Sequence, residues 1–353
     1  MNKLVKYLSP FAPDQSGACG VLYEFGGIVV ICDAGGCAGN ICGFDEPRWF
    51  THKSAVFSAG LRDMDAILGR DDKLVEKLAK AHEQLNAEFT AIIGTPVPAV
   101  IATDHKALKR MSEKKTGVPC IAADCTGTHY YDVGEQKVWA ELFREFAVER
   151  YDKKSGRVGV IGATPLETSM MTSDHIVSEC HSMGITEPIV YGMGFGLDYV
   201  REASKAEKNL VVSLAAIPAA EYLKEKFGTP YEVSFPFLPE RVVRRVQTMN
   251  GKKVLIIHAQ LIANALRDNM RGCDVTNCTW FGQNAALKQD VDFVIRNEEM
   301  LAETVKNSGY DVIIADGAVK RLLDSVGFSG EFVDFPHFAV SGELWDNGES
   351  YED

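Results

Sequence analysis

The chain has no apolar run long enough to cross a membrane. Its longest runs, such as Ile28 to Cys32 and Val254 to Ile257, have the length of strands, whereas a membrane-spanning helix needs about 20 apolar residues. The start of the chain also lacks the apolar stretch of a secretory signal, because "YLSPFAPDQ" directly follows Lys3 and Lys6. We therefore expect a cytoplasmic protein without a membrane partner.

Basic residues are few compared with acidic ones. The 37 Lys and Arg against 49 Asp and Glu leave a net charge of −12, whereas nucleic-acid-binding proteins carry a basic face. Proteins and small molecules are therefore the expected partners, and nucleic acids are not. The phosphate-binding motif GxxxxGK[ST] is absent as well, so if ATP is used, another protein must bind it.

The length and composition suit two or three α/β units, since the chain has 353 residues of which 46% are hydrophobic. Strand-like apolar runs alternate with helical periodicity, the pattern of parallel βαβ units whose crossover helices cover the sheet. The runs predict three α/β domains over residues 1–150, 157–248 and 250–353. The polar segment 151–157, "YDKKSGR", is expected to link the first two domains, and "GCDVTNCTW" is expected to be a loop or a strand end.

Several motifs outside the cysteines have ordinary structural interpretations. "YGMGFG" places Gly192, Gly194 and Gly196 between a predicted strand and helix, but it lacks the spacing of GxGxxG. We expect a tight turn that lets the backbone approach another part of the chain, rather than a dinucleotide site.

Polar residues also follow predicted elements. His105, His258 and His337 lie at element ends, where solvated or hydrogen-bonded histidines are common. Asp316 follows "DVIIA" and could either face a cleft or cap the next helix. These residues are not predicted to be ligands.

Nine cysteines are present, an odd number that favours metal binding or catalysis over disulfides in the cytoplasm. Cys32 and Cys180 are expected to be small buried hydrophobic residues, and the pairs 120/125 and 273/278 give no specific signal. Cys19, Cys37 and Cys42 each lie among glycines, where backbone N–H groups of a turn can face an anionic centre such as a thiolate-bound iron–sulfur cluster. The alternative is that these thiols lie in glycine turns by chance.

The segments around these cysteines resemble the nitrogenase component 1 superfamily. Cys19 in "SGACGVLYEFGGI" and Cys37 in "CDAGGCAG" match its first two cluster-ligand segments, the second of which reads "HGPxGC" in the family. "SAGLRDMDAILGRDDKLVEKL" and the segment from "TAIIGTPVPAV" to "AADCTG" are similar to the family stretches that follow. "GKKVLIIHAQLIANALRD" and "DVIIADG…FVDFPHFAVSG" resemble the start and end of its last domain, so the resemblance covers nearly the whole chain.

The resemblance implies an α/β fold of three Rossmann-like domains with parallel sheets around a central cavity. It implies an oxidoreductase component that takes electrons from an ATP-dependent iron–sulfur reductase protein and passes them through a subunit-bridging iron–sulfur cluster to a small-molecule substrate. Cys19 and Cys37 are the implied metal ligands, with Cys42 in reserve. In a homodimer, or with a homologous subunit, two ligands per chain would hold a 4Fe-4S cluster, and three would hold a larger 8Fe centre like the P-cluster.

Three positions depart from the family. Thr95 stands where the third cluster cysteine is expected, and neither Val212 nor the Pro336–His337 pair supplies a clearly aligned ligand for the catalytic cofactor of nitrogenase. The resemblance therefore implies a reductase that does not fix dinitrogen. The alternatives are a non-catalytic scaffold for metal-cofactor assembly and a binding protein that has lost its cluster.

Overall fold

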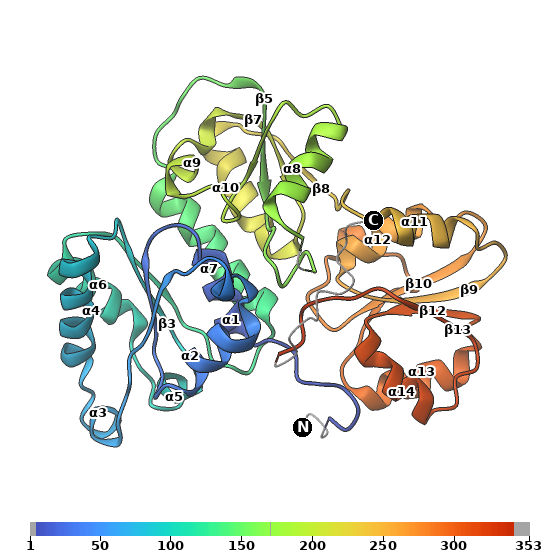
Figure 1. Ribbon diagram of the computed structural model, residues 1–353, viewed down its shortest axis with the longest axis horizontal. Helices are drawn as coiled ribbons and strands as arrows, with labels where there is room; N and C mark the ends of the chain where they lie inside the picture. Colours follow the sequence, from blue (N-terminus) through green and yellow to red (C-terminus); the bar gives the residue numbers. More distant parts are fainter. Residues whose placement is uncertain (1–4, 170, 342–353) are drawn as a thin grey trace.

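The computed structural model describes residues 5–169 and 171–341, and it contains three parallel sheets with helices packed on them (Figure 1). This confirms the predicted α/β fold class. The sheets lie in sequence order along the chain, and each has its own set of crossover helices. No helix of the described residues is long and apolar enough to span a membrane.

The first sheet has the strand order β2-β1-β3-β4. Its strands are β1 (Ile28–Ile31), β2 (Ala55–Ser58), β3 (Thr90–Ile93) and β4 (Cys120–Ala123). The surrounding α-helices are α1 (Asp14–Leu22), α2 (Gly36–Asn40), α3 (Asp63–Leu68), α4 (Asp71–Leu85), α5 (Pro96–Val100), α6 (His105–Thr116) and α7 (Tyr131–Phe146), with a π-helix η1 (Ile41–Asp45) and a 3-10 helix η2 (Pro47–Phe50).

The second sheet has the order β6-β5-β7-β8. It contains β5 (Lys154–Ile161), β6 (Glu187–Val190), β7 (Ala206–Val211) and β8 (Tyr231–Val233), with α8 (Ser173–Ser182), α9 (Leu197–Arg201), η3 (Ala203–Lys205), η4 (Leu214–Ala216) and α10 (Ile217–Phe227). The segment predicted as a linker is only partly one, because β5 already begins at Lys154, where its pairing with β7 starts.

The third sheet has the order β11-β10-β9-β12-β13. It contains β9 (Lys253–Ile257), β10 (Asp274–Thr279), β11 (Phe293–Val294), β12 (Val312–Ala315) and β13 (Glu331–Asp334), with α11 (Glu240–Gln247), α12 (Gln260–Asp268), η5 (Ala285–Leu287), α13 (Glu298–Ser308), η6 (Gly317–Val319) and α14 (Lys320–Ser325). "GCDVTNCTW" is therefore mostly strand rather than loop, because its polar residues pair with β9.

Two hydrophobic cores are shared between neighbouring domains. Helix α7 lies between the first two sheets (Figure 1), and its Phe143 ring packs edge-on against Tyr191 with centroids 5.0 Å apart. A second core joins residues of β5 and β7 with residues of β9 and β12. The three sheets thus form one packed body. The domain boundaries at residues 150, 157, 248 and 250 stay a prediction.

Helices α1 and α7 pack unusually closely because of two glycines. A Cβ added at Gly17 would lie 2.0 Å from the Tyr131 carbonyl oxygen, and one added at Gly134 would lie 1.8 Å from the Asp14 carbonyl oxygen. These distances are far below van der Waals contact, so only glycine fits at either crossing point.

We expect Gly134→Ala to lower the free energy of unfolding by about 2 kcal/mol, because the added methyl group forces the two backbones apart. Alanine normally stabilises a helix interior relative to glycine by roughly 0.5–1 kcal/mol. Helix propensity alone would therefore predict a gain in stability, whereas we expect a loss. Denaturant unfolding measures the effect. Gly20→Ala is the control, because its Cβ would first meet Glu46 Oε2 at an ordinary 3.7 Å; equal loss in both variants would contradict this explanation.

Candidate functional site

The structure corrects the local setting predicted for the three candidate cysteines. Cys19 lies inside α1, Cys37 in the short helix α2, and Cys42 in η1. Cys19 is therefore not in a glycine turn. The glycine before it, Gly17, is needed for the contact with α7. A turn does precede Cys37, where Gly35 has φ +122°.

The segment that carries Cys37 is held by Asp33, which follows the end of β1. Its carboxylate accepts hydrogen bonds from the Ala38 backbone N–H at 2.8 Å and from Ser58 Oγ at 2.6 Å. These bonds fix the chain between β1 and β2 at the carboxyl end of the first sheet. Cys37 is consequently half-buried and placed by backbone contacts rather than by its own side chain.

Cys19 and Cys42 are brought close to each other. Asp45, at the end of η1, accepts hydrogen bonds from Ser16 Oγ on α1 at 2.6 Å and from Asn40 Nδ2 at 2.9 Å, which ties the two helices together. Cys19 is fully buried and Cys42 is half-buried.

The electrostatic setting keeps these thiols protonated in the metal-free chain. Burial, the Glu46 carboxylate and the neighbouring Cys42 all raise the pKa of Cys19. Burial and Glu46 raise the pKa of Cys42 to about 11, and burial raises that of Cys37. A bound metal would have to displace these protons, since thiolates are the form that binds iron.

Thr95 lies next to Cys37 in space, although 58 positions separate them in the sequence. The Thr95 hydroxyl donates a hydrogen bond to the Cys32 carbonyl oxygen at 2.8 Å and is fully buried. Its structural role is therefore to join β1 to the start of α5. A hydroxyl in this role does not replace a thiolate as an iron ligand.

Cysteine thiols are the right kind of ligand for an iron–sulfur cluster, but one chain does not supply enough of them. Within residues 5–169 and 171–341, no three His, Cys, Asp or Glu side chains are grouped so that they could hold a metal ion. Soft thiolates are the ligands that such clusters use, and a cubane takes about four of them. Cys19, Cys37 and Cys42 would therefore need ligands from another chain.

Arg48 connects the cysteine segment to the middle domain. Its guanidinium donates to Glu46 at 2.7 Å, to Glu24 at 2.9 Å, and to the carbonyl oxygens of Gly20 at 2.6 Å and Gly192 at 2.8 Å. The Glu46 carboxylate is also the one that raises the pKa of Cys19 and of Cys42. Arg48 therefore joins the candidate ligand segment, helix α1 and the "YGMGFG" turn in one network.

The "YGMGFG" turn is the tight turn that the sequence predicts. Gly192 has φ +76°, and a Cβ there would lie 3.1 Å from the Phe25 ring and 3.2 Å from the Val21 carbonyl oxygen. The Gly194 N–H donates to Glu24 Oε2 at 2.7 Å. The partner that the backbone approaches is thus the end of α1.

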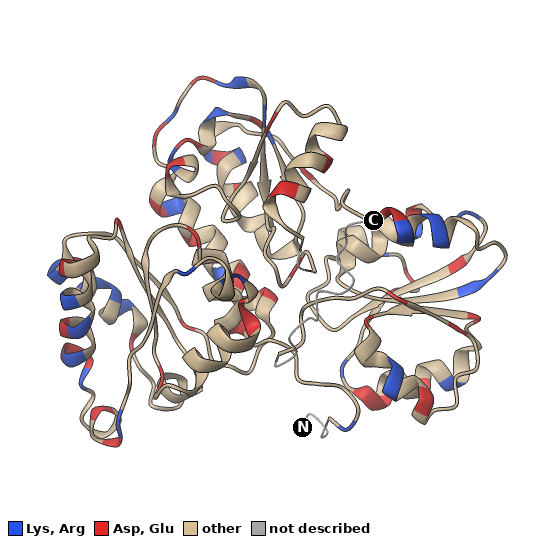
Figure 2. Cartoon of the chain, viewed as in Figure 1, with Lys and Arg blue, Asp and Glu red and all other residues tan. Residues whose placement is uncertain are grey.

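A second group of candidate functional residues lies where the three sheets meet, at the start of α7. We call it the junction cluster, and it consists of Tyr131, Asp132, Glu135, Glu167, His258 and His337. Figure 2 shows acidic residues at this end of α7. The members other than Asp132 are buried, and they come from α7 and from the segments that follow β5, β9 and β13, the strand ends at which parallel sheets usually bind ligands.

Tyr131 is the centre of the junction cluster. Its hydroxyl donates to Glu167 Oε2 at 2.7 Å and lies 3.1 Å from His337 Nε2. The His337 ring stacks on His258 with centroids 4.4 Å apart. Glu135 accepts a hydrogen bond from Thr164 Oγ1 at 2.6 Å.

Burial holds the junction cluster in neutral forms. It raises the pKa of Glu135, with the Glu167 charge as the second cause, and it raises the pKa of Glu167 to about 7. It lowers the pKa of His337 to about 3, and that of His258 below its ordinary value, where the neighbouring His337 contributes. Glu167 therefore titrates near neutral pH, the protonated form of Glu135 is favoured, and both imidazoles are neutral.

Sequence reasoning found this cluster only in part. His258, His337 and Asp316 were noted as ends of elements, and the Asp316 carboxylate both accepts from the His337 backbone N–H at 2.7 Å and caps η6. Glu135 and Glu167 were missed, because nothing in a single sequence distinguishes a buried glutamate on a helix or turn from an exposed one. His105, the third histidine, is the buried first residue of α6 and lies outside the cluster.

Three cavities lie near these residues. One of about 20 Å³ is lined by Asp132, Glu167, Ser213 and Gln260, and one of about 30 Å³ is lined by His258, His337 and Phe281 among others. Each has room for about one or two water molecules.

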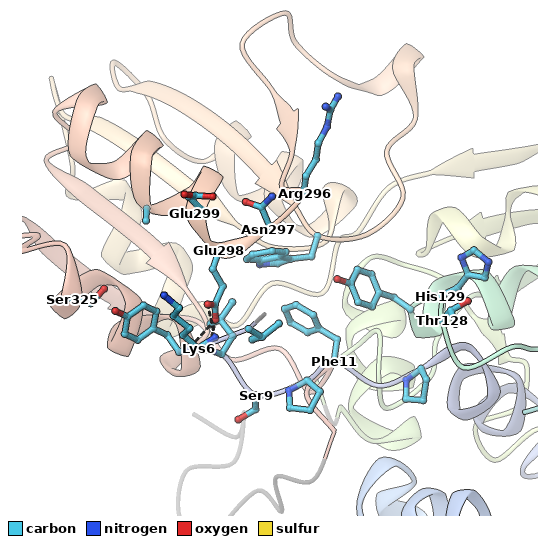
Figure 3. Close-up of a pocket in the computed structure, with 18 of the residues that line it drawn as sticks. Lys6, Ser9, Phe11, Thr128, His129, Arg296, Asn297, Glu298, Glu299 and Ser325 are labelled. Atoms are coloured by element: carbon cyan, nitrogen blue, oxygen red, sulfur yellow. Dashed lines mark hydrogen bonds between the residues drawn. The ribbon is translucent and has the colours of Figure 1, made fainter. Parts of the chain in front are cut away.

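The third and larger cavity, of about 430 Å³, lies between the N-terminal segment and the third domain (Figure 3). The Glu298 carboxylate on its wall accepts the backbone N–H groups of Lys6, Tyr7 and Leu8 at 2.7, 2.9 and 2.7 Å. This side chain is therefore used to hold the N-terminal segment, and none of the candidate cysteines lines the cavity.

The comparisons with known proteins agree with this architecture. Residues 15–249 match the family described as nitrogenase component 1 type oxidoreductase, which is about two thirds of the chain. The chain therefore belongs to that family of oxidoreductases. No curated protein matches it.

Solved structures show the same fold over nearly the whole chain. The structure described as nitrogenase Cp1 at pH 6.5 is 12% identical with a TM-score of 0.72, and the match covers 98% of this chain and 89% of that one. The structure described as nitrogenase Cp1 at pH 5 is 14% identical with a TM-score of 0.69, and covers 97% and 86%. At these identities the likeness establishes the fold alone.

Proposed function

We propose that the chain is the substrate-reducing component of a nitrogenase-like enzyme of the cytoplasm, and that it does not fix dinitrogen. Two copies, or one copy and a homologous subunit, share an iron–sulfur cluster held by Cys19 and Cys37, with Cys42 as a further ligand in an 8Fe form. The cluster supplies one-electron transfer when bound. The observation that carries the proposal is the placement of three thiols on adjoining helices of one domain in a chain of this family.

An exposed apolar surface beside Cys37 supports pairing of two first domains. Cys37 contacts Thr95, the residue that precedes α5, and on α5 Val97 and Val100 are 40% and 85% exposed. Exposed apolar residues that lie together mark interaction surfaces. A two-fold contact there would bring both sets of thiols to one axis and supply the missing ligands.

The chain's own residues then have two tasks. The cysteine segment, fixed by Asp33 and Arg48, holds the electron-accepting group, and the junction cluster provides a water-poor site with neutral acids for a small-molecule substrate. A buried, proton-bearing site suits reduction because electrons added to a substrate must be matched by protons. Val212, which follows β7, has no donor atom that could hold a cofactor, and His337 Nε2 lies 3.1 Å from the Tyr131 hydroxyl.

The proposal predicts that ATP hydrolysis depends on a partner. The purified chain alone is expected to hydrolyse no ATP, because it has no phosphate-binding loop. With an ATP-dependent iron–sulfur reductase protein and a chemical reductant, both ATP hydrolysis and repeated substrate turnover are expected, as measured by phosphate release and product formation. Intrinsic ATPase activity would contradict the proposal, and stoichiometric transfer of a bound metal species without turnover would favour an assembly scaffold.

A further inference from the structure

Two acidic residues of the junction cluster, Asp132 and Glu167, line a cavity that has room for water. We propose that Glu167 supplies the proton for the substrate at the junction of the three sheets, through a water molecule in the cavity beside it, and that Tyr131 orients the Glu167 carboxyl group. This inference rests on the proposed function, which supplies the electrons. It assigns a proton source to a site for which the resemblance names no residue.

Burial and hydrogen bonding together distinguish Glu167 from the other acids of the cluster. It lines the cavity of about 20 Å³ with Asp132, Ser213 and Gln260, so a water molecule can reach it. Unlike Asp132, it is buried and accepts a hydrogen bond from the Tyr131 hydroxyl. Glu135 is fully buried and is held by Thr164. Thr164 also accepts the Glu167 backbone N–H at 3.2 Å, which places the two glutamates around one hydroxyl.

The surroundings of Glu167 raise its pKa above the ordinary value of a glutamate. Burial removes water, and the Asp132 carboxyl on α7 adds a like charge, whereas the Tyr131 hydroxyl and Ser213 favour the carboxylate by hydrogen bonding. Glu167 in turn raises the pKa of Glu135, on which Arg48 acts in the opposite direction. His337 and His258 complete the titratable neighbours, and both are neutral, so no cation of the cluster offsets the burial.

The proton transfer is simple to write. A substrate that has gained an electron takes a proton from a water molecule in the cavity, and that water takes the proton of the Glu167 carboxyl group. The carboxyl O–H bond breaks, a bond to hydrogen forms at the reduced atom, and the electron pair stays on the carboxylate. The Tyr131 hydroxyl, 2.7 Å away, stabilises that carboxylate. A proton from solvent, carried by a water in the small cavity, restores the acid. The chemistry suits a substrate with an unsaturated carbon or nitrogen atom.

The first test combines infrared spectroscopy with turnover. In the purified protein at pH 6, we expect the carbonyl stretch of a protonated carboxyl group that is lost in Glu167→Gln and that titrates near neutral pH in the parent. With the reductase partner, Glu167→Gln should lower kcat by about 10²-fold or more, while electron delivery to the cluster stays unchanged. Glu221→Gln, on the exposed side of α10, is the control and should change neither signal.

The second test uses Tyr131→Phe, which removes one hydrogen bond to the carboxylate and keeps the ring. The titration midpoint of the Glu167 band should move upward, because the hydroxyl that favours the ionised form is gone. A merely structural role for Tyr131 would lower stability without moving this midpoint. The infrared readout needs neither partner nor substrate, so it also tests the proposal if a variant turns over poorly for other reasons.

The outcomes separate this inference from the proposed function. If the parent turns over and Glu167→Gln turns over equally well, Glu167 is not the donor, while the proposed function stands. Absence of a protonated carboxyl band from Glu167 at pH 6 also overturns the inference. If the parent shows no turnover with any reductase partner, the proposed function fails and the donor role fails with it.

Discussion

Cys37→Ala is expected to remove essentially all bound iron from the protein and to weaken its dimer. Cys37 is the half-buried member of the pair Cys19 and Cys37. It contacts Thr95, the residue before α5, and Val97 and Val100 of that helix are exposed. If each chain supplies two thiolates to a shared cluster, loss of one per chain leaves about half of the ligands that a cubane needs. Because the cluster then no longer joins the two chains, iron analysis and sedimentation should change together.

Two other cysteine variants make the prediction specific. Cys180→Ala, on a helix of the middle domain, should retain both the iron and the dimer. Cys42→Ala distinguishes the two cluster sizes, because unchanged iron points to the 4Fe form and loss of iron points to the 8Fe form. A cluster that survives Cys37→Ala would contradict the symmetric arrangement.

Arg48→Ala is expected to lower the free energy of unfolding by about 3 kcal/mol. The guanidinium is only 13% exposed and neutralises Glu46, which is 2% exposed, and Glu24. Removing one partner of a buried ion pair leaves the other charge without compensation, which costs about 3–5 kcal/mol. The variant also removes hydrogen bonds to the carbonyl oxygens of Gly20 and Gly192, so the contact between the first and middle domains should weaken as well.

Denaturant unfolding measures the loss, and an exposed ion pair provides the control. Arg244 pairs with Glu240 on α11, where the two side chains are 73% and 66% exposed. Arg244→Ala should therefore cost less than about 1 kcal/mol. Similar losses in the two variants would mean that Arg48 acts as an ordinary surface residue, and not as the connection between the cysteine segment and the middle domain.

Much of the fold could be predicted from the chain because the signals are local. The strand at Ile28–Ile31 is an uninterrupted apolar run, and the helix at Asp71–Leu85 has apolar residues at helical spacing. Both patterns follow directly from side-chain periodicity. The strand at Asp274–Thr279 was predicted only as a loop or a strand end, because its polar residues interrupt the apolar run that marks a buried strand, although they pair with β9.

The setting of Cys19 could not be predicted for a related reason. Glycines near a cysteine indicate either a turn or a close helix contact, and only the position of α7 decides between them. The closeness of Glu135 on α7 to Glu167 after β5 likewise depends on how the first and middle domains pack together. A single sequence carries the residues of such a site, but not the packing that makes them neighbours and raises their pKa values.

The most direct test of the account is the iron and sulfide content per chain after anaerobic purification, measured together with the oligomeric state. A cluster shared on a two-fold axis predicts a dimer with about two iron atoms per chain for the 4Fe form, or about four for the 8Fe form. A colourless protein without iron, or a monomer that keeps a full cluster, would contradict it.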